Sequence, residues 1–367
     1  MTTTRFRFSL PLLLLLLGAA GIAGFAQAPK QKTAKSKSTA SMPALPPLPK
    51  TGALNSAKAG TSFTFVVLGD NRPAKQTATQ PVITGQLISD MKRYKPEFIL
   101  WTGDVIAGKD PKAKVIHHEY EKFLELAKTA GVPVFDVPGN HEMNAAQNAP
   151  CPAMGKLYQK YMVKELYGAF GYGNSRFIGL NTDSLQKTAN CKPPTKKNYD
   201  NKGYVDKHQL DSLDAYLKAN AGADYIFIFM HRPMFPKSGG VGLNEASTTD
   251  LEKIFKKYEK NKNIAYVLAA HEHLYYNALT KNDSPPPCLP SNAQMPFYLV
   301  SGGAGAPLSG DKDEGEEEEQ GEFDPDAFYH YLVFEVAPGT VKVTLVKCGT
   351  DPTKAQCIAQ PSCPPIQ

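Results

Sequence analysis

Five apolar, strand-like runs in this chain are each followed at once by polar residues of a kind that can bind a metal ion. Runs of this length and composition are typical of buried strands. In chain order, the polar residues are Asp70, Asp104, Asn140 with His141, His231, and His271 with His273. A single polar residue at a strand end is usually a cap or a turn residue, but capping does not explain the same feature at five strand ends.

The first three of these polar groups are one strand–helix unit apart. Asp70 and Asp104 are separated by 34 residues, and Asp104 and Asn140 by 36. The expected elements alternate as strand 64–68, helix 80–94, strand 97–103, helix 115–130 and strand 132–137. This alternation predicts βαβ units with a covered parallel sheet. Because parallel strands end at the same sheet edge, we expect the five groups to share one cleft.

The later part of the chain also alternates between strands and helices. Strands are expected at 176–182, 225–230, 264–270, 297–303, 331–336 and 341–346, and helices at 206–219 and 248–260. Several late strands with short connections predict a second, more antiparallel sheet packed against the first. The acidic run 311–322 is expected to be a solvated loop, with a calcium site or a gate over a phosphate pocket as the alternative.

The N-terminal segment has the pattern of a secretory signal. Arg5 and Arg7 precede an apolar run at 10–17, and small residues lead to an A-x-A-like site at 26–28. We expect residues 1–28 to be a signal peptide, with a retained anchor as the alternative. The protein is then secreted or periplasmic, without a stable membrane span after cleavage. Residues 29–60 are expected to be a flexible basic linker rather than a nucleic-acid-binding segment.

The cysteines agree with an oxidising compartment, because their number is even in a chain that carries an export signal. They are Cys151, Cys191, Cys288, Cys348, Cys357 and Cys363. The first two flank one segment and are a candidate pair, and one of the last three is a candidate partner for Cys288. All fifteen pairings remain open. We place the folded domain at 61–347 and a Cys/Pro-rich tail at 348–367.

Five motifs carry a resemblance to a known family. GDNR (69–72), GDVIAG (103–108), PGNHE (138–142), FMHRP (229–233) and AHEHLYY (270–276) resemble, in order, the motifs of the calcineurin-like metallophosphoesterases. The resemblance covers residues 62 to 346, and five motifs in order are highly specific. It implies an α/β fold of the αββα two-sheet sandwich type, with a dinuclear metal site at the carboxyl-terminal strand edge.

The resemblance also implies a role for each motif residue. Asp104 would bridge two divalent or trivalent ions, zinc, manganese or iron. The implied further ligands are Asp70 and His273 for the first ion, and Asn140, His231 and His271 for the second. His141 would stabilise charge on the phosphate or protonate the leaving oxygen. Glu142 would orient the ring of His141. A metal-activated hydroxide would attack phosphorus.

Three positions depart from the family pattern. Arg72 stands where the first motif has an imidazole, and a guanidinium cannot coordinate a metal. We expect Arg72 either to clamp the substrate phosphate or to replace the charge of the first ion. The first metal site would then be weak or empty. His117 and His118 are the alternative source of the missing ligand. Ala107 stands where purple acid phosphatases have a tyrosine, which argues against an iron–tyrosinate enzyme, and Ala270 replaces a glycine.

The leading hypothesis is therefore an exported, metal-dependent hydrolase of phosphate esters, acting on monoesters or diesters of a small or polymeric substrate. The alternative is a catalytically weakened phosphate-binding or interaction module that keeps the fold with one metal. A third possibility is a nucleic-acid binder that uses the basic segment 29–60. No nucleic-acid partner beyond a possible substrate is expected.

Overall fold

The computed structural model describes residues 57–76, 79–108, 110, 112, 114–145, 149–184, 202–238, 241–283, 296–309, 324 and 327–361. The chain divides into two units, Met1–Ser41 and Met42–Gln367, and every described residue belongs to the second. The expected signal peptide, most of the basic linker and the acidic run lie outside the described residues. Within the described part of the chain, no helix has the length and apolar character needed to cross a membrane.

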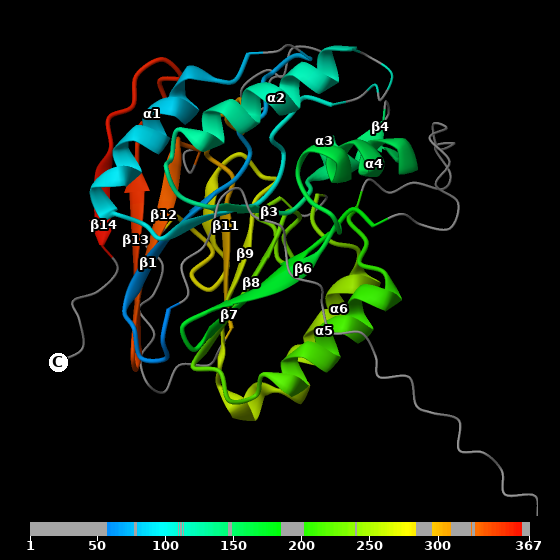
Figure 1. The fold of residues 1–367 in the computed structure, drawn as a ribbon, viewed down its shortest axis with the longest axis vertical. Helices are drawn as coiled ribbons and strands as arrows, with labels where there is room; N and C mark the ends of the chain where they lie inside the picture. The colour runs from blue at the N-terminus through cyan, green and yellow to red at the C-terminus, as the bar shows by residue number, and fades with distance from the viewer. Residues whose placement is uncertain are drawn as a thin grey trace, which may run out of the picture. The chain divides into compact units, whose positions relative to one another are not determined.

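The first sheet has six strands in the order β14-β13-β12-β1-β2-β3 (Figure 1). Strands β1 (Phe63–Leu68), β2 (Phe98–Trp101) and β3 (Val134–Asp136) are parallel, as the strand–helix alternation predicts. Helices α1 (Val82–Met91) and α2 (Lys114–Lys128) connect these strands and pack on the outer face of the sheet, with 3-10 turn Lys92–Tyr94 after α1.

The second sheet has six strands in the order β10-β11-β9-β8-β7-β6. They are β6 (Gly168–Tyr172), β7 (Ser175–Leu180), β8 (Tyr225–Met230), β9 (Ile264–Ala269), β10 (Tyr275–Asn277) and β11 (Phe297–Ser301). The four central strands are parallel and the two edge strands antiparallel. Helices α5 (Lys207–Ala219) and α6 (Glu245–Lys257) cover its outer face, and 3-10 turn Glu259–Asn261 follows α6.

The prediction for the late strands is wrong in two respects. Strands β12 (His330–Ala337) and β13 (Thr340–Lys347) belong to the first sheet, and the second sheet is parallel at its centre. The reason is that β2 occupies only one side of β1, and β12 satisfies the backbone groups on the other side by pairing antiparallel to it. Strand β14 (Ile358–Pro361) comes from the expected tail and pairs with β13.

The Cys348–Cys357 disulfide closes the short connection between β13 and β14. Both cysteines belong to the expected tail, and the tail reaches the first sheet through the pairing of β14 with β13. Cys151 is also disulfide-bonded. The other three cysteines of the sequence lie outside the described residues, and the candidate pairings that involve them stay predictions.

Aromatic side chains fill the space between the inner faces of the two sheets. Phe65 stacks on Phe98 and Phe334 of its own sheet at centroid distances of 5.4 and 4.7 Å. It also makes edge contacts with Phe177 and Phe227 of the other sheet, at 5.2 and 5.0 Å. The two-sheet αββα sandwich that the resemblance implies is thus confirmed, with helices outside and one apolar core between the sheets.

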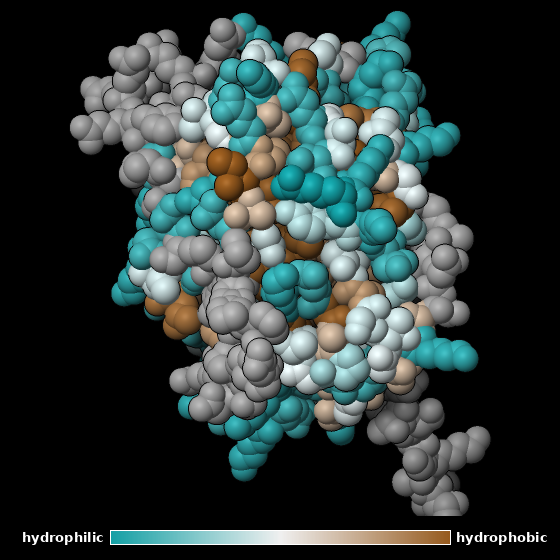
Figure 2. Space-filling model, turned by 90° about the vertical axis from the view of Figure 1, so that its left-hand side faces the viewer, coloured by the Kyte–Doolittle hydropathy of each residue, from teal (hydrophilic) through white to brown (hydrophobic). Residues whose placement is uncertain are grey.

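The surface is predominantly hydrophilic on the side drawn in Figure 2, where hydrophobic side chains are scattered. The large hydrophobic side chains that are most exposed among the described residues are Val82, Leu279 and Ile358, from three separate segments. The remaining elements are short and lie between the two sheets in sequence. They are α3 (Asn140–Met143), β4 (Asn144–Ala145), β5 (Ala149–Pro150) and α4 (Pro152–Tyr161).

Candidate metal centre

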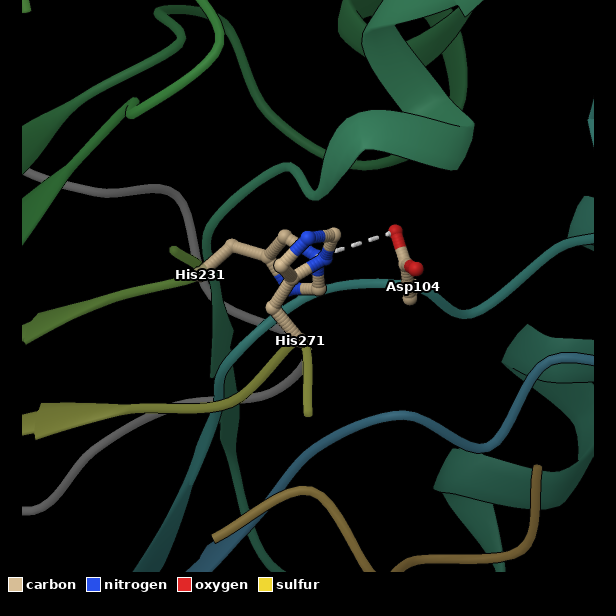
Figure 3. A group of neighbouring side chains, drawn as sticks. All are labelled: Asp104, His231 and His271. Atoms are coloured by element: carbon tan, nitrogen blue, oxygen red, sulfur yellow. Dashed lines mark hydrogen bonds and ion pairs between the residues drawn. The ribbon is translucent and has the colours of Figure 1, made fainter. Parts of the chain in front are cut away.

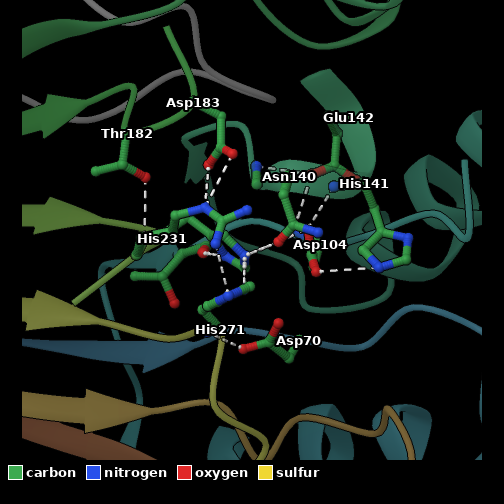
Figure 4. Close-up of polar contacts among 12 residues, drawn as sticks. Asp70, Asp104, Asn140, His141, Glu142, Thr182, Asp183, His231 and His271 are labelled. Atoms are coloured by element: carbon green, nitrogen blue, oxygen red, sulfur yellow. Dashed lines mark hydrogen bonds and ion pairs between the residues drawn. The ribbon is translucent and has the colours of Figure 1, made fainter. Parts of the chain in front are cut away.

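The structure brings the polar residues at the five strand ends together at one edge of the sandwich (Figure 4). Five of them form two groups of possible metal ligands, in each of which the ligand atoms lie within 4.8 Å of one another. The first donor group is Asp70, Asp104 and His273, and the second donor group is Asp104, His231 and His271. Asp104 belongs to both groups, as a bridging residue would.

Three of these residues have a backbone conformation that is uncommon outside glycine. The φ angles of Asp70, Asp104 and His271 are 59°, 54° and 73°. Neighbouring backbone groups hold the turns in place, because the Asp70 N–H donates to Gly103 O at 3.1 Å and the His271 N–H to Asp70 Oδ2 at 2.6 Å. Such strain is characteristic of functional sites, where it aims a side chain into a cleft.

In the second donor group, acceptor atoms face one another. The His231 ring donates its Nδ1–H to Thr102 O at 2.8 Å, which leaves a lone pair on Nε2. That Nε2 lies 2.9 Å from Asn140 Oδ1 and 3.4 Å from Asp104 Oδ1, and Figure 3 shows the side chains of this group (Asp104, His231 and His271) converging. A cation between these atoms would satisfy all three, so the donor set fits a metal ion of the zinc, manganese or iron type.

The first donor group has the same character. His273 donates its Nδ1–H to Pro307 O at 2.5 Å, and its Nε2 faces Asp70 Oδ1 at 3.6 Å. Asp70 Oδ1 is buried and has no hydrogen-bond partner among the residues that the structure describes. A buried carboxylate oxygen without a partner is costly unless a cation compensates it, and this site also fits a metal ion.

Glu142 holds the turn that carries Asp104. Its carboxylate accepts the N–H groups of Asp104, Val105, Ile106 and Gly139 at 2.8, 2.9, 3.1 and 2.8 Å. The family resemblance implies that Glu142 orients His141, whereas the ring of His141 donates its Nδ1–H to Ala107 O at 2.6 Å. The oriented ring places Nε2 3.8 Å from Asp104 Oδ2.

Burial governs the charge of these carboxylates. It raises the pKa of Glu142 to about 7, with the charge of Asp104 adding to the effect. It also raises the pKa of Asp104, to which the neighbouring Asp70 contributes and which Arg72 opposes. Burial and then the charge of Arg232 lower the pKa of His271 well below its ordinary value. Burial thus favours the neutral forms of these side chains until a cation compensates the carboxylates.

Arg72 follows Asp70 by two positions in the sequence. The residue is 7% exposed, and Nη1 donates to Pro73 O at 3.5 Å. The guanidinium is close enough to Asp104 to oppose the rise in the pKa of that carboxyl. The histidines considered as replacement ligands are elsewhere: His117 bonds Tyr161 Oη at 2.8 Å and His118 bonds Glu121 at 3.0 Å, both on α2.

Sequence reasoning missed several charged residues that support the ligands. Arg232, directly after His231, binds Asp183 and contacts His271. Glu272 lies between two candidate ligands and accepts the N–H groups of Lys237 and Ser238, both at 2.7 Å. Asp183 follows β7 closely, so the rule that identified the five strand ends would also have pointed to it.

The raised carboxyl pKa values predict how the stability of the protein without metal depends on pH. With metal removed by a chelator, we expect the free energy of unfolding to fall by about 1–2 kcal/mol between pH 6.5 and 8. The folded state keeps protons on Glu142 and Asp104 that the unfolded chain has released, so stability decreases as pH rises through the folded pKa values. Urea unfolding at several pH values measures this.

His271 and His330 act in the opposite direction at the lower end of that window. Their pKa values are lowered from 6.5 in the folded state, so the unfolded chain binds protons there that the folded state does not, and this contribution to stability rises with pH by about 0.4 kcal/mol per ring before it levels off. The carboxyl groups outweigh it, and the decline should be clearest in the upper half of the window. Added Mn²⁺ should remove the decline, and Asp104→Asn should weaken it. A stability that stays flat or rises in the chelated protein contradicts the prediction.

The comparisons with known proteins agree with this geometry. The profile of the calcineurin-like phosphoesterase family matches residues 63–275. No match was found among curated proteins.

Several solved structures share the fold. The purple acid phosphatase PPD1 from yellow lupin (Lupinus luteus) seeds is 14% identical with a TM-score of 0.56, over 85% of this chain and 58% of that one. GAP50, the anchor in the inner membrane complex of Plasmodium, is 14% identical with a TM-score of 0.53, over 82% and 88% of the two chains. A dimetal phosphatase from Danio rerio is 13% identical with a TM-score of 0.50, over 81% and 98%.

At these identities the structures show the fold alone, and this chain spans only 58% of the lupin phosphatase. The family profile carries more weight, because it matches more than half of the chain and includes the first four motifs and all but the last residue of the fifth. The resemblance seen in the sequence is confirmed, and the chain belongs to the calcineurin-like phosphoesterase family.

Proposed function

We propose that the protein is an exported, metal-dependent phosphoesterase that hydrolyses phosphate monoesters or diesters at a dinuclear site. The observation that carries the proposal is the pair of donor groups that share the buried Asp104. Two cations held side by side are suited to phosphate esters, because two carboxylates against two dications leave a positive site for an anionic substrate.

The chain supplies a separate set of ligands for each ion. The assignment is Asp70 and His273 to the first ion, Asn140, His231 and His271 to the second, and Asp104 to both. When bound, the ions supply Lewis-acid activation of water and neutralise charge on the phosphoryl oxygens. Glu142 keeps Asp104 aimed between them by binding the backbone of its turn.

His141 is the group placed to handle the leaving oxygen. Its side chain is 14% exposed, and its Nδ1 is committed to Ala107 O, so Nε2 is the nitrogen that faces the cleft. Protonated at Nε2, the ring can donate to a phosphoryl oxygen or transfer a proton to the leaving group. In the neutral form with its proton on Nδ1, it can do neither.

Arg72 is proposed to clamp the substrate phosphate beside a weakened first site. Its planar fork suits two phosphate oxygens. Near the first donor group it also repels the ion, by roughly 4 kcal/mol for two unit charges about 4 Å apart at an effective dielectric near 20, and about double for a dication. Its contribution to the charge balance of Asp104 supports this position.

Export is supported by the signal-like N-terminus and by the disulfides. A Cys348–Cys357 bridge and a bonded Cys151 are expected in an oxidising space. We propose a signal peptide over residues 1–28, a basic linker to residue 60 and a folded domain that extends through β14.

The rival proposal is a phosphate-binding module that has lost the chemistry, and Arg72 is the observation that favours it. Purified mature protein with Mn²⁺ or Zn²⁺ should hydrolyse p-nitrophenyl phosphate or bis-p-nitrophenyl phosphate. Turnover of either ester supports the enzyme. Failure with both esters and both metals, in protein that binds phosphate, supports the module.

Replacing His141 tests its proposed role. We expect His141→Ala to lower kcat for the better of the two esters by about 10²–10⁴-fold, because the ring acts on the reacting phosphate. The number of Mn²⁺ ions bound per chain should not change. The matched control is His118→Ala, whose side chain is 64% exposed and pairs with Glu121. Equal kcat values in the two variants exclude the role.

Replacing Arg72 separates the clamp from a structural role. We expect Arg72→His to raise the number of metal ions bound per chain and to raise KM for the ester, because it adds an imidazole and removes the phosphate contact. Elemental analysis and steady-state kinetics measure the two effects. Arg93→His is the control, on an exposed 3-10 turn. If both the metal content and KM are unchanged in Arg72→His, Arg72 does not clamp the substrate phosphate.

A further inference from the structure

Arg232 is fixed in place by groups that it cannot easily leave. The side chain is fully buried, and its Nε–H is shared between Asp183 Oδ1 and Oδ2 at 2.9 and 3.1 Å. Nη1 carries two hydrogens, and among the described residues it lies 2.9 Å from both Val241 O and His271 Nε2. One N–H of a pinned guanidinium therefore points at a ring nitrogen of a candidate metal ligand.

This contact determines which nitrogen of His271 carries the proton. Arginine is a permanent donor, so His271 Nε2 must be the acceptor and Nδ1 must carry the hydrogen. Nδ1 lies 3.1 Å from His231 Nε2, which is an acceptor because His231 donates from Nδ1 to Thr102 O. Hydrogen bonds thus run in one direction from Arg232 through His271 and His231 to a backbone carbonyl.

Metal coordination requires the opposite arrangement. Nδ1 is the nitrogen of His271 that faces His231 and the second donor group, as Figures 3 and 4 show. To bind an ion there, Nδ1 must present a lone pair, and the proton of the neutral ring then sits on Nε2. The Nε2–H of His271 would then point at an N–H of Arg232, whose Nη1 lies 2.9 Å from Nε2. Two hydrogen-bond donors would face each other with no acceptor between them.

We propose that Arg232 is a positioning residue that selects the Nδ1-protonated form of His271 and thereby weakens the second metal site. The ion binds only when Arg232 withdraws from His271 Nε2. The hydrogen bonds of Arg232 to Asp183 and Val241 oppose this movement. The second ion is consequently exchangeable, and occupancy depends on the free metal concentration. This inference rests on the ligand set of the proposed function.

The test removes the arginine together with its partner. The double variant Asp183→Asn/Arg232→Met eliminates the N–H at His271 while leaving the net formal charge unchanged, and it avoids an unpaired buried Asp183. The control is Arg176→Met, which removes a partly buried arginine bonded to Asn220 at 2.7 Å. Calorimetric titration of chelator-treated full-length protein with Mn²⁺ gives the dissociation constants, and the step lost in His231→Ala identifies the second site.

We expect the Kd of that step to fall at least about tenfold in the double variant and to stay unchanged in Arg176→Met. An equal or higher Kd in the double variant overturns the inference while leaving the proposed function intact. Absence of the step in the unaltered protein overturns the ligand set itself, and the proposed function with it.

A spectroscopic measurement on the unaltered protein needs no change to Arg232. With ¹⁵N-labelled histidine, the imidazole nitrogen shifts show which ring nitrogen is protonated, and His271→Ala identifies the signals. In the metal-free protein we expect His271 to carry its proton on Nδ1. A proton on Nε2 contradicts the proposed contact, whatever the double variant does.

Discussion

Asp104 carries a carboxylate that is buried, shared between two donor groups and borne on a left-handed turn. Much of the surrounding structure holds that one side chain in place. Glu142 binds the backbone of the turn, and a Cβ on Gly139 would come within 2.1 Å of Asp104 Oδ1, so the neighbouring loop must lack a side chain there. Because burial opposes the charge of Asp104, the arrangement favours a bound cation.

The aromatic contact between the sheets makes this convergence possible. Asp104 comes from the first sheet, while His231 and His271 come from the second, so the donor groups exist only when the inner faces are packed with their carboxyl-terminal edges together. Arg232 and Glu272, each next to a candidate ligand in sequence, bind residues of the loop that follows β8. These hydrogen bonds tie the strand ends that carry His231 and His271 to that loop.

The sequence predicted most of this architecture through local patterns. Apolar runs and strand-end polar residues identified β1, β2, β3, β8 and β9, and the candidate ligands that follow them. The pairing of β12 with β1 was missed, because an apolar strand does not specify its partner. Arg232 was missed for a similar reason. Its position after a strand does not reveal that it pairs with Asp183, because the buried ion pair joins residues 49 positions apart.

Diffraction from crystals soaked in Mn²⁺, recorded at a wavelength where manganese scatters anomalously, tests the central claim most directly. We predict two anomalous peaks. One lies within coordination distance of Asp70, Asp104 and His273, and the other within coordination distance of Asp104, Asn140, His231 and His271. Peaks that avoid Asp104, or no peak in this cleft at saturating Mn²⁺, would contradict this prediction.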